Sequence, residues 1–216
     1  MSSDDYMVVL GSIKYNYMRD TRSIDLEIFS LRANKWKQAA SDLPYRKTAG
    51  YEVGPIVGSF LNGSIHWLVH NYETKSDVII TYDLKETTMS EIALPDDFYS
   101  GHSLRICDLM VFGGLISVWN VKRSKIKIWV MQEYKVHSSW SKTLELSFSP
   151  TLNFSPICFT SCGDIVGPDA AVGLAKLNDN GQLLEYHSYG EFYFKRSQMT
   201  VYTESLLSLP DGTEHA

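Results

Sequence analysis

The stretch Phe60-Leu61-Asn62-Gly63-Ser64-Ile65-His66-Trp67-Leu68 has the form of a β-hairpin. Apolar and polar residues alternate on both sides of Asn-Gly, a pair favoured in two-residue turns because both positions adopt positive φ. The stretches Val111-Phe112-Gly113-Gly114-Leu115-Ile116 and Thr160-Ser161-Cys162-Gly163-Asp164-Ile165 place glycine at the equivalent point. The three predicted turns recur at about 50 residues, so the sequence contains a structural repeat.

Short runs in which apolar residues recur with period two continue on both sides of these turns, and no stretch has the pattern of an amphipathic helix. The runs are Tyr6–Gly11, Ile24–Leu31, Ile56–Leu61, Ile65–His70, Val78–Leu84, Leu109–Phe112, Leu115–Asn120, Ile126–Tyr134, Pro156–Thr160, Val172–Leu177 and Leu183–His187. Four short strands per repeat are typical of propeller blades. The sequence therefore predicts an all-β fold, a partial kelch-like β-propeller of about four blades of short antiparallel strands.

The repeat also predicts the domain organisation. We expect one propeller-like domain over residues 1–216 that lacks its N-terminal blade. The first repeat begins at Tyr6, and its innermost strand is missing. Thr200–Leu206 is a candidate for the strand that completes this first blade, and residues 207–216 are expected to form a flexible tail.

Composition limits the classes of partner. The 216 residues carry a formal net charge of −5 and no long uninterrupted run of Lys and Arg, which argues against binding nucleic acid or an anionic membrane by bulk charge. No segment is long and apolar enough for a membrane-spanning helix, and no secretory signal is visible. The three cysteines are too few for a disulfide framework. We expect reduced thiols and a cytoplasmic or nuclear location.

Candidate chemical sites have simpler structural interpretations. His66-Trp67 follows a hairpin turn and is interpreted as packing on the two faces of a strand. Trp36, Met89 and Trp140 follow equivalent third-strand turns, so we expect them in the apolar layers between blades. Cys158 and Cys162 lack the further ligands of a structural zinc site. No catalytic motif occurs, so we predict no catalytic residue, no metal, no cofactor and no enzymatic activity.

Binding is predicted at one end of the blades. The turns between first and second strands are short, whereas the connections between second and third strands and between blades are longer, and all of the longer ones fall at the same end of a meander. These longer segments are Asn16–Ser23, Ala40–Pro55, Asn71–Asp77, Ala93–Ser103 and Ser147–Ser155. Loops on a rigid scaffold commonly bind partners, and Tyr and Arg are enriched at interface hot spots. The candidate partner-binding residues are Tyr15, Tyr17, Arg19, Tyr45, Arg46, Tyr72, Phe98, Tyr99 and His102. The alternative is that several of these side chains pack beneath their own loops.

Seven stretches, in order along nearly the whole chain, resemble the plant F-box-associated domain of F-box/kelch-type substrate receptors. They are Asp4-Asp5-Tyr6-Met7-Val8-Val9, Ile28-Phe29-Ser30-Leu31-Arg32-Ala33-Asn34-Lys35-Trp36, Phe60–Leu68, Ile80-Thr81-Tyr82-Asp83-Leu84, Ile128-Trp129-Val130-Met131-Gln132-Glu133-Tyr134, Ser139-Trp140-Ser141-Lys142 and Val201-Tyr202-Thr203-Glu204-Ser205-Leu206. The resemblance implies a non-enzymatic adaptor. In such proteins an F-box binds the Skp-type subunit of a cullin ubiquitin ligase, and the β domain selects the protein to be ubiquitinated.

The sequence departs from this family at its start, where it has neither the F-box nor the first strand-rich segment. The expected partner is therefore a protein substrate, and a Skp-type adaptor is expected only for a full-length form that carries the F-box. Two alternatives remain open at this point. One is a truncated product with no independent function, and the other is a propeller-type hydrolase or carbohydrate-binding domain.

Overall fold

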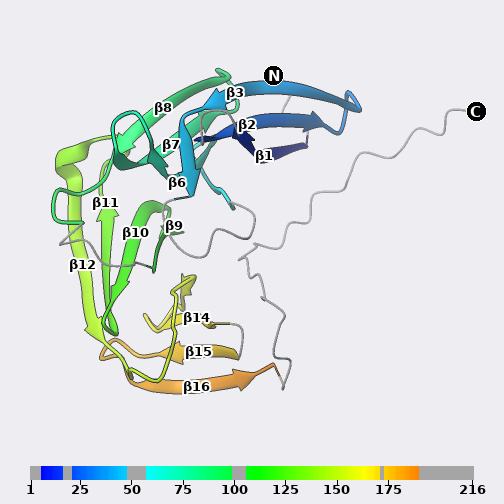
Figure 1. The fold of residues 1–216 in the computed structure, drawn as a ribbon. Coiled ribbons are helices and arrows are strands. Elements are labelled where there is room, and N and C mark those ends of the chain that lie inside the picture. The colour runs from blue at the N-terminus through cyan, green and yellow to red at the C-terminus, as the bar shows by residue number, and fades with distance from the viewer. Residues whose placement is uncertain (1–5, 17–20, 48–56, 99–105, 171–172, 190–216) are drawn as a thin grey trace, which may run out of the picture. The chain divides into compact units, whose positions relative to one another are not determined.

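The computed structural model describes residues 6–16, 21–47, 57–98, 106–170 and 173–189. These residues form four antiparallel sheets and one short 3-10 helix, His137–Ser139 (Figure 1). The predicted all-β class is thus confirmed. Within the described residues no helix is long and apolar enough to cross a membrane. The chain divides into two compact units, residues 1–43 with 200–216 and residues 44–199.

The first unit contains a three-stranded meander of β1 (Met7–Asn16), β2 (Thr21–Ser30) and β3 (Lys35–Leu43). Ile24, Leu26 and Ile28 of β2 are buried, as the period-two pattern predicts for one face of a strand. The prediction of a long loop at Asn16–Ser23 is wrong, because β1 and β2 both continue into this segment and Asn16 pairs with Thr21.

The second unit begins with a sheet whose innermost strand is divided. It contains β4 (Tyr45–Lys47), β5 (Ser59–Leu61), β6 (Ser64–Asn71), β7 (Ser76–Asp83) and β8 (Thr88–Ala93). Both β4 and β5 pair with β6, one with each half of that strand. The predicted innermost strand Ile56–Leu61 is therefore only its second segment. Ala40–Pro55, expected to be a loop, contains the end of β3 and all of β4.

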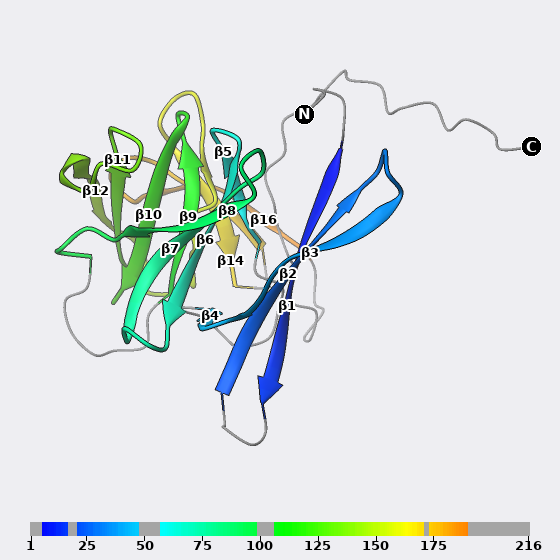
Figure 2. The same cartoon turned by 90° about the horizontal axis from the view of Figure 1, so that it is seen from above.

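The next two sheets are four-stranded meanders (Figures 1 and 2). The first is formed by β9 (Ile106–Phe112), β10 (Leu115–Lys122), β11 (Lys125–Met131) and β12 (Trp140–Ser147). The second is formed by β13 (Cys158–Phe159), β14 (Ile165–Asp169), β15 (Gly173–Leu177) and β16 (Leu183–Ser188). We call the three sheets of the second unit, in chain order, the β6, β10 and β14 sheets.

Two of the three predicted glycine turns have the expected geometry. Leu61 pairs with Ser64 across Asn62-Gly63, and Phe112 pairs with Leu115 across Gly113-Gly114, with positive φ at all four turn residues. The third turn differs, because Thr160 N–H donates to Asp164 O and so encloses three residues. Gly163 takes the left-handed position at φ +88°, which is the usual form of a three-residue hairpin loop.

Consecutive sheets of the second unit pack face to face. Leu68 and Ile79 of the β6 sheet share one apolar core with Ile116, Val118 and Trp129 of the β10 sheet. The opposite face of the β10 sheet forms a second core with the β14 sheet, which includes Trp119, Ile128, Phe154, Ile165 and Leu177. The β10 sheet is therefore buried on both faces, as expected for a blade between two neighbours.

The predicted packing roles hold for most of the aromatic residues. His66 is fully buried, Trp67 is 7% exposed, and Trp140 packs against the core between the β6 and β10 sheets. The prediction that Trp36 lies in an apolar layer between blades is wrong. This residue is 49% exposed and contacts Phe29 across the β2–β3 hairpin, with 5.1 Å between ring centroids. Residues 207–216 and the candidate strand Thr200–Leu206 lie outside the described residues, and the single domain stays a prediction.

Candidate functional site

The end of the β6 sheet that contains the β6–β7 turn brings together three of the predicted binding residues. Tyr45 and Arg46 lie in β4 and pair with Asn71 and His70 at the end of β6. Tyr72 begins the turn, and its backbone N–H donates to Pro44 O at 2.9 Å. The split innermost strand therefore positions two residues that sequence reasoning placed in a loop. We call Tyr45, Arg46, His70 and Tyr72 the aromatic cluster.

Side chains of this cluster contact one another. The Arg46 guanidinium lies over the Tyr72 ring, 5.4 Å from its centroid. The His70 ring packs edge-on against the same Tyr72 ring, with 6.0 Å between the two centroids. Arg46 is exposed and both Tyr45 and Tyr72 are half-buried, so the cluster offers a cationic group and aromatic edges to a partner.

The polar groups beneath the cluster are hydrogen-bonded. Tyr45 Oη donates to Glu91 Oε1 at 2.6 Å, and Asn71 Nδ2 donates to the same oxygen at 3.0 Å. Burial first, and then the Glu91 carboxylate, hold the pKa of Tyr45 well above its ordinary value. The phenol therefore keeps its proton and acts as a hydrogen-bond donor rather than as a base.

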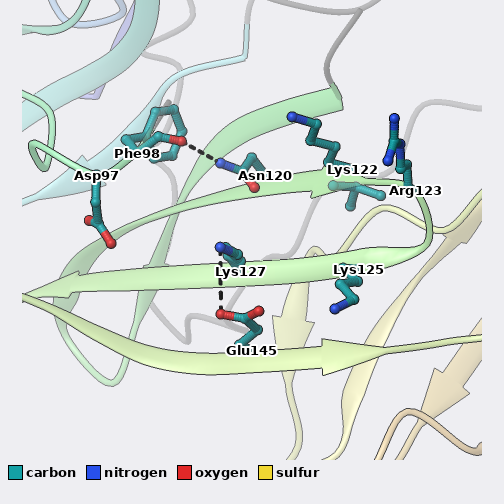
Figure 3. Close-up of a pocket in the computed structure, with 9 residues that line it drawn as sticks. Asp97, Phe98, Asn120, Lys122, Arg123, Lys125, Lys127 and Glu145 are labelled. Atoms are coloured by element: carbon teal, nitrogen blue, oxygen red, sulfur yellow. Dashed lines mark hydrogen bonds and ion pairs between the residues drawn. The ribbon is translucent and has the colours of Figure 1, made fainter. Parts of the chain in front are cut away.

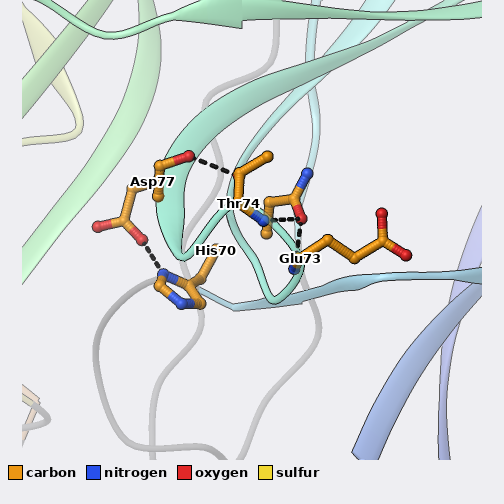
Figure 4. Close-up of polar contacts among 6 residues, drawn as sticks. His70, Glu73, Thr74 and Asp77 are labelled. Atoms are coloured by element: carbon orange, nitrogen blue, oxygen red, sulfur yellow. Dashed lines mark hydrogen bonds and ion pairs between the residues drawn. The ribbon is translucent and has the colours of Figure 1, made fainter.

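The β6–β7 turn itself is closed by its own side chains (Figure 4). Asn71 Oδ1 accepts the N–H groups of Glu73 at 2.9 Å and Thr74 at 3.3 Å, which is an Asx turn. His70 Nδ1 lies 2.6 Å from Asp77 Oδ1 across the two strands. This pair orients the His70 ring against Tyr72.

The structure corrects the prediction that Phe98 is an exposed binding residue. Its side chain is 1% exposed and packs edge-on against Trp129, with 5.1 Å between centroids. Trp129 Nε1 donates to Asp97 Oδ1 at 2.7 Å, so the segment after β8 is fixed to the β10 sheet. For Phe98 the alternative prediction, packing beneath its own loop, is correct, because burial of an aromatic ring stabilises the fold.

The other predicted binding residues receive no test from the structure. Tyr17, Arg19, Tyr99 and His102 lie outside the described residues. Tyr15 lies in β1 and pairs with Arg22, but its side chain is outside the described part of the chain. These five positions stay predictions.

Sequence reasoning missed a pocket at the equivalent end of the β10 sheet (Figure 3). Its volume is about 280 Å³. The lining residues are Asp97, Phe98, Asn120, Val121, Lys122, Arg123, Lys125, Lys127 and Glu145. The signal for it is the segment Lys122-Arg123-Ser124-Lys125-Ile126-Lys127, in which four of six residues are basic although the whole chain is acidic. We call Lys122, Arg123, Lys125 and Lys127 the basic turn residues.

His66 is a structural residue. Its Nδ1 lies 3.1 Å from Ser59 O, and its Nε2 lies 2.8 Å from Tyr134 Oη. Because a carbonyl oxygen only accepts, Nδ1 carries the proton and Nε2 accepts from the tyrosine hydroxyl. Burial lowers the pKa of His66. The neutral ring thus joins the β6 and β10 sheets.

The cysteines form no disulfide, and Cys107 is buried, Cys158 half-buried and Cys162 exposed. Within the described ranges, no three His, Cys, Asp or Glu side chains are grouped in a way that could hold a metal ion.

Comparison with known proteins identifies the family. The F-box/kelch-repeat protein At3g23880 of Arabidopsis thaliana is 28% identical over 192 residues, which cover 84% of this chain and 47% of the relative. The F-box protein CPR1 of the same plant is 26% identical over 161 residues, which cover 65% of this chain and 37% of the relative. The chain spans less than half of the length of these relatives. Residues 1–204 match the family described as the F-box associated beta propeller domain. Since this match covers nearly the whole sequence, the chain belongs to the family of F-box associated β-propeller domains.

Proposed function

We propose that this protein is a non-enzymatic substrate-recognition module of an SCF-type cullin ubiquitin ligase. The observation that carries the proposal is the family match over residues 1–204, together with relatives that are F-box proteins. In this role the β domain selects a protein, and the other ligase subunits supply the chemistry. A Skp-type adaptor joins only a form of the protein that carries an F-box.

The aromatic cluster is our candidate for the surface that contacts the substrate. Arg46 is exposed and Tyr72 is half-buried, and their arrangement is fixed because the β4–β6 ladder and the Asx turn hold their backbones. Side chains that are ordered before binding lose less conformational entropy on association. The proposal places the protein in the cytoplasm or nucleus, where ubiquitin ligases of this kind act.

The test is affinity purification from plant cells of two tagged proteins. One is the chain as it stands, and the other is the same chain fused behind an F-box. We expect both to retain a shared set of proteins, and only the fusion to retain a Skp-type adaptor and ubiquitinated forms of that set. A chain that folds but retains no specific protein in either form would contradict the proposed function.

A further inference from the structure

The face of the β10 sheet that packs on the β6 sheet changes from apolar to charged towards the β10–β11 turn. Val118 and Trp129 on this face belong to the core. One pair further along, Asn120 lies opposite Lys127, and Lys127 lies opposite Glu145. The last pair, Lys122 and Lys125, flanks the turn. The pocket is thus the point at which the core between two sheets opens into a basic surface.

The acidic groups of the pocket are already engaged. Glu145 lies 3.6 Å from Lys127 Nζ and 3.4 Å from Lys142 Nζ. Partial burial raises the pKa of Glu145, but these two ammonium groups outweigh it, and the pKa is lowered overall. Asp97 accepts from the Trp129 indole. Among the described residues, Arg123 and Lys125 have no ion pair, and four cations face two carboxylates.

The turn carries two local features that weaken it. Lys122 and Lys125 are like charges directly opposite each other, which is unfavourable in an antiparallel pair. Arg123 and Ser124 have φ of +50° and +58°, which are values that favour glycine and asparagine. At Asn62-Gly63 and Gly113-Gly114 the chain uses suitable residues for the same conformation. Locally unfavourable residues of this kind are characteristic of functional positions.

A buried amide in the pocket has an unused acceptor. Asn120 is 9% exposed, and its Nδ2 donates to Phe98 O at 2.7 Å, which fixes the orientation of the amide. Among the described residues, Asn120 Oδ1 has no hydrogen-bond partner. Figure 3 shows this oxygen directed towards β11 and Lys127. A buried acceptor without a partner is costly, so the site favours a ligand that also brings an N–H donor.

We propose that this pocket binds an acidic peptide segment of the substrate, with a carboxylate or phosphate group held by Arg123 and Lys125 and a peptide N–H held by Asn120 Oδ1. The inference rests on the proposed function and specifies the chemistry of the protein that is recognised. A peptide fits better than a nucleic acid because the volume of about 280 Å³ admits one anionic side chain, and the chain as a whole has a net charge of −5. Bound anion also offsets the repulsion between Lys122 and Lys125.

Fluorescence anisotropy on the full chain tests this assignment. The probes are short labelled Gly/Ala peptides that differ only in a central pair, which is Ser-Ser, Glu-Glu or two phosphoserines, and a short single-stranded oligonucleotide. We expect the Glu and phosphoserine peptides to bind and the Ser peptide to bind at least about tenfold more weakly, since charge-assisted hydrogen bonds distinguish them. The two anionic arms show whether carboxylate or phosphate is preferred. The affinity should fall as salt is raised.

Two variants locate the binding. Arg123→Gln/Lys125→Gln should weaken the anionic peptides about tenfold or more, whereas the control Lys37→Gln/Lys85→Gln removes two exposed cations elsewhere and should have no effect. Arg123→Asn/Ser124→Gly should also weaken binding while making the turn more favourable, so that unfolding does not explain the loss.

The proposal is overturned by equal binding of all peptides, by unchanged binding in both turn variants, or by preference for the oligonucleotide. These outcomes are separate from the proposed function. If anionic peptides do not bind but the chain still retains specific proteins from plant cells, the acidic-peptide inference fails and the substrate-recognition role stands.

Discussion

The β6–β7 and β10–β11 turns occupy equivalent positions in two adjacent sheets, yet they differ in how their polar groups are satisfied. At the β6–β7 turn, Asn71 accepts two backbone N–H groups and His70 pairs with Asp77. At the β10–β11 turn, Lys122 faces Lys125, and Arg123 has no ion pair among the described residues. One turn is stabilised by hydrogen bonds from its own side chains, whereas the other places like charges opposite each other and has left-handed backbone at an arginine and a serine.

Under the proposed function, this difference corresponds to a division of roles on one scaffold. The repeated strands place each turn at the end of a sheet, and packing between the sheets fixes both. The residues within the turns are then free to differ, because they contribute little to the core. The aromatic cluster offers a preformed contact surface, and the basic pocket offers charge. Substitutions in the packing between the sheets, in the turns and in the aromatic cluster test these roles separately.

The largest effect is expected at the support beneath the basic turn. Trp129→Ala removes a ring that is 1% exposed, packs on Phe98 and donates to Asp97. Loss of a buried aromatic ring costs about 3–5 kcal/mol of the free energy of unfolding. Urea unfolding measures this change. Trp129→Phe keeps most of the packing and should cost clearly less, and equal costs would contradict the role given to the ring.

The second effect concerns the polar link between the two sheets. His66→Leu leaves Ser59 O and Tyr134 Oη without their partner and should cost about 2 kcal/mol of the free energy of unfolding. The folded-state pKa of His66 is lowered, so stability from this residue is present above about pH 6.5, the unfolded value. It is lost as the pH falls from there through the lower folded pKa.

Chemical unfolding of the wild type and His66→Leu at several pH values measures both effects. The difference between the two proteins should shrink as the pH is lowered below about 6.5. A difference that grows on acidification would mean that the protonated ring is favoured in the fold, and would contradict the neutral state assigned to His66.

Exchanging turn residues between two hairpins should change the free energy of unfolding by a smaller amount, with a gain in one variant and a loss in the other. Arg123→Asn/Ser124→Gly should raise the free energy of unfolding by about 1–2 kcal/mol, because left-handed backbone is costly for other L-residues. Asn62→Arg/Gly63→Ser should lower it by a similar amount. Thermal unfolding of both variants checks the signs. Destabilisation by the first exchange would show that the Arg-Ser turn is already favourable.

The smallest effect on stability is expected at the aromatic cluster. Arg46→Ala removes a contact between an exposed guanidinium and the Tyr72 ring, and such contacts contribute about 0.5–1 kcal/mol. Arg46→Lys keeps the charge and serves as the control. A loss of several kcal/mol on Arg46→Ala, measured by urea unfolding, would assign the residue to the fold instead of to binding.

Much of the fold was predictable because its signals are local. Period-two runs and glycine turns predicted most of the strands, and the packing of His66-Trp67 was predicted correctly from its position after Asn62-Gly63. The division of the innermost strand into β4 and β5 was not predictable, since its two segments are joined only through their pairing with β6. Tyr45 and Arg46 were therefore expected in a loop.

The candidate site was harder to predict for a similar reason. Burial of Phe98 depends on Trp129, which lies in another sheet. The basic pocket was missed because the chain is acidic overall and because Ser124 and Ile126 interrupt the basic residues. In a hairpin these residues gather at one end, so local charge at a turn is more informative here than net charge.

The most direct test of the substrate-recognition role is quantitative proximity labelling with the full chain in plant cells. The test variant is Arg46→Ala/Tyr72→Ala, and the control is Phe60→Ser/Val111→Ser, which changes exposed residues beside the glycine turns at the opposite strand ends. We predict that the control labels the same proteins as the wild type and that the aromatic-cluster variant loses them. Equal labelling by all three folded proteins, or loss only in the control, would contradict the assignment of substrate binding to the aromatic cluster.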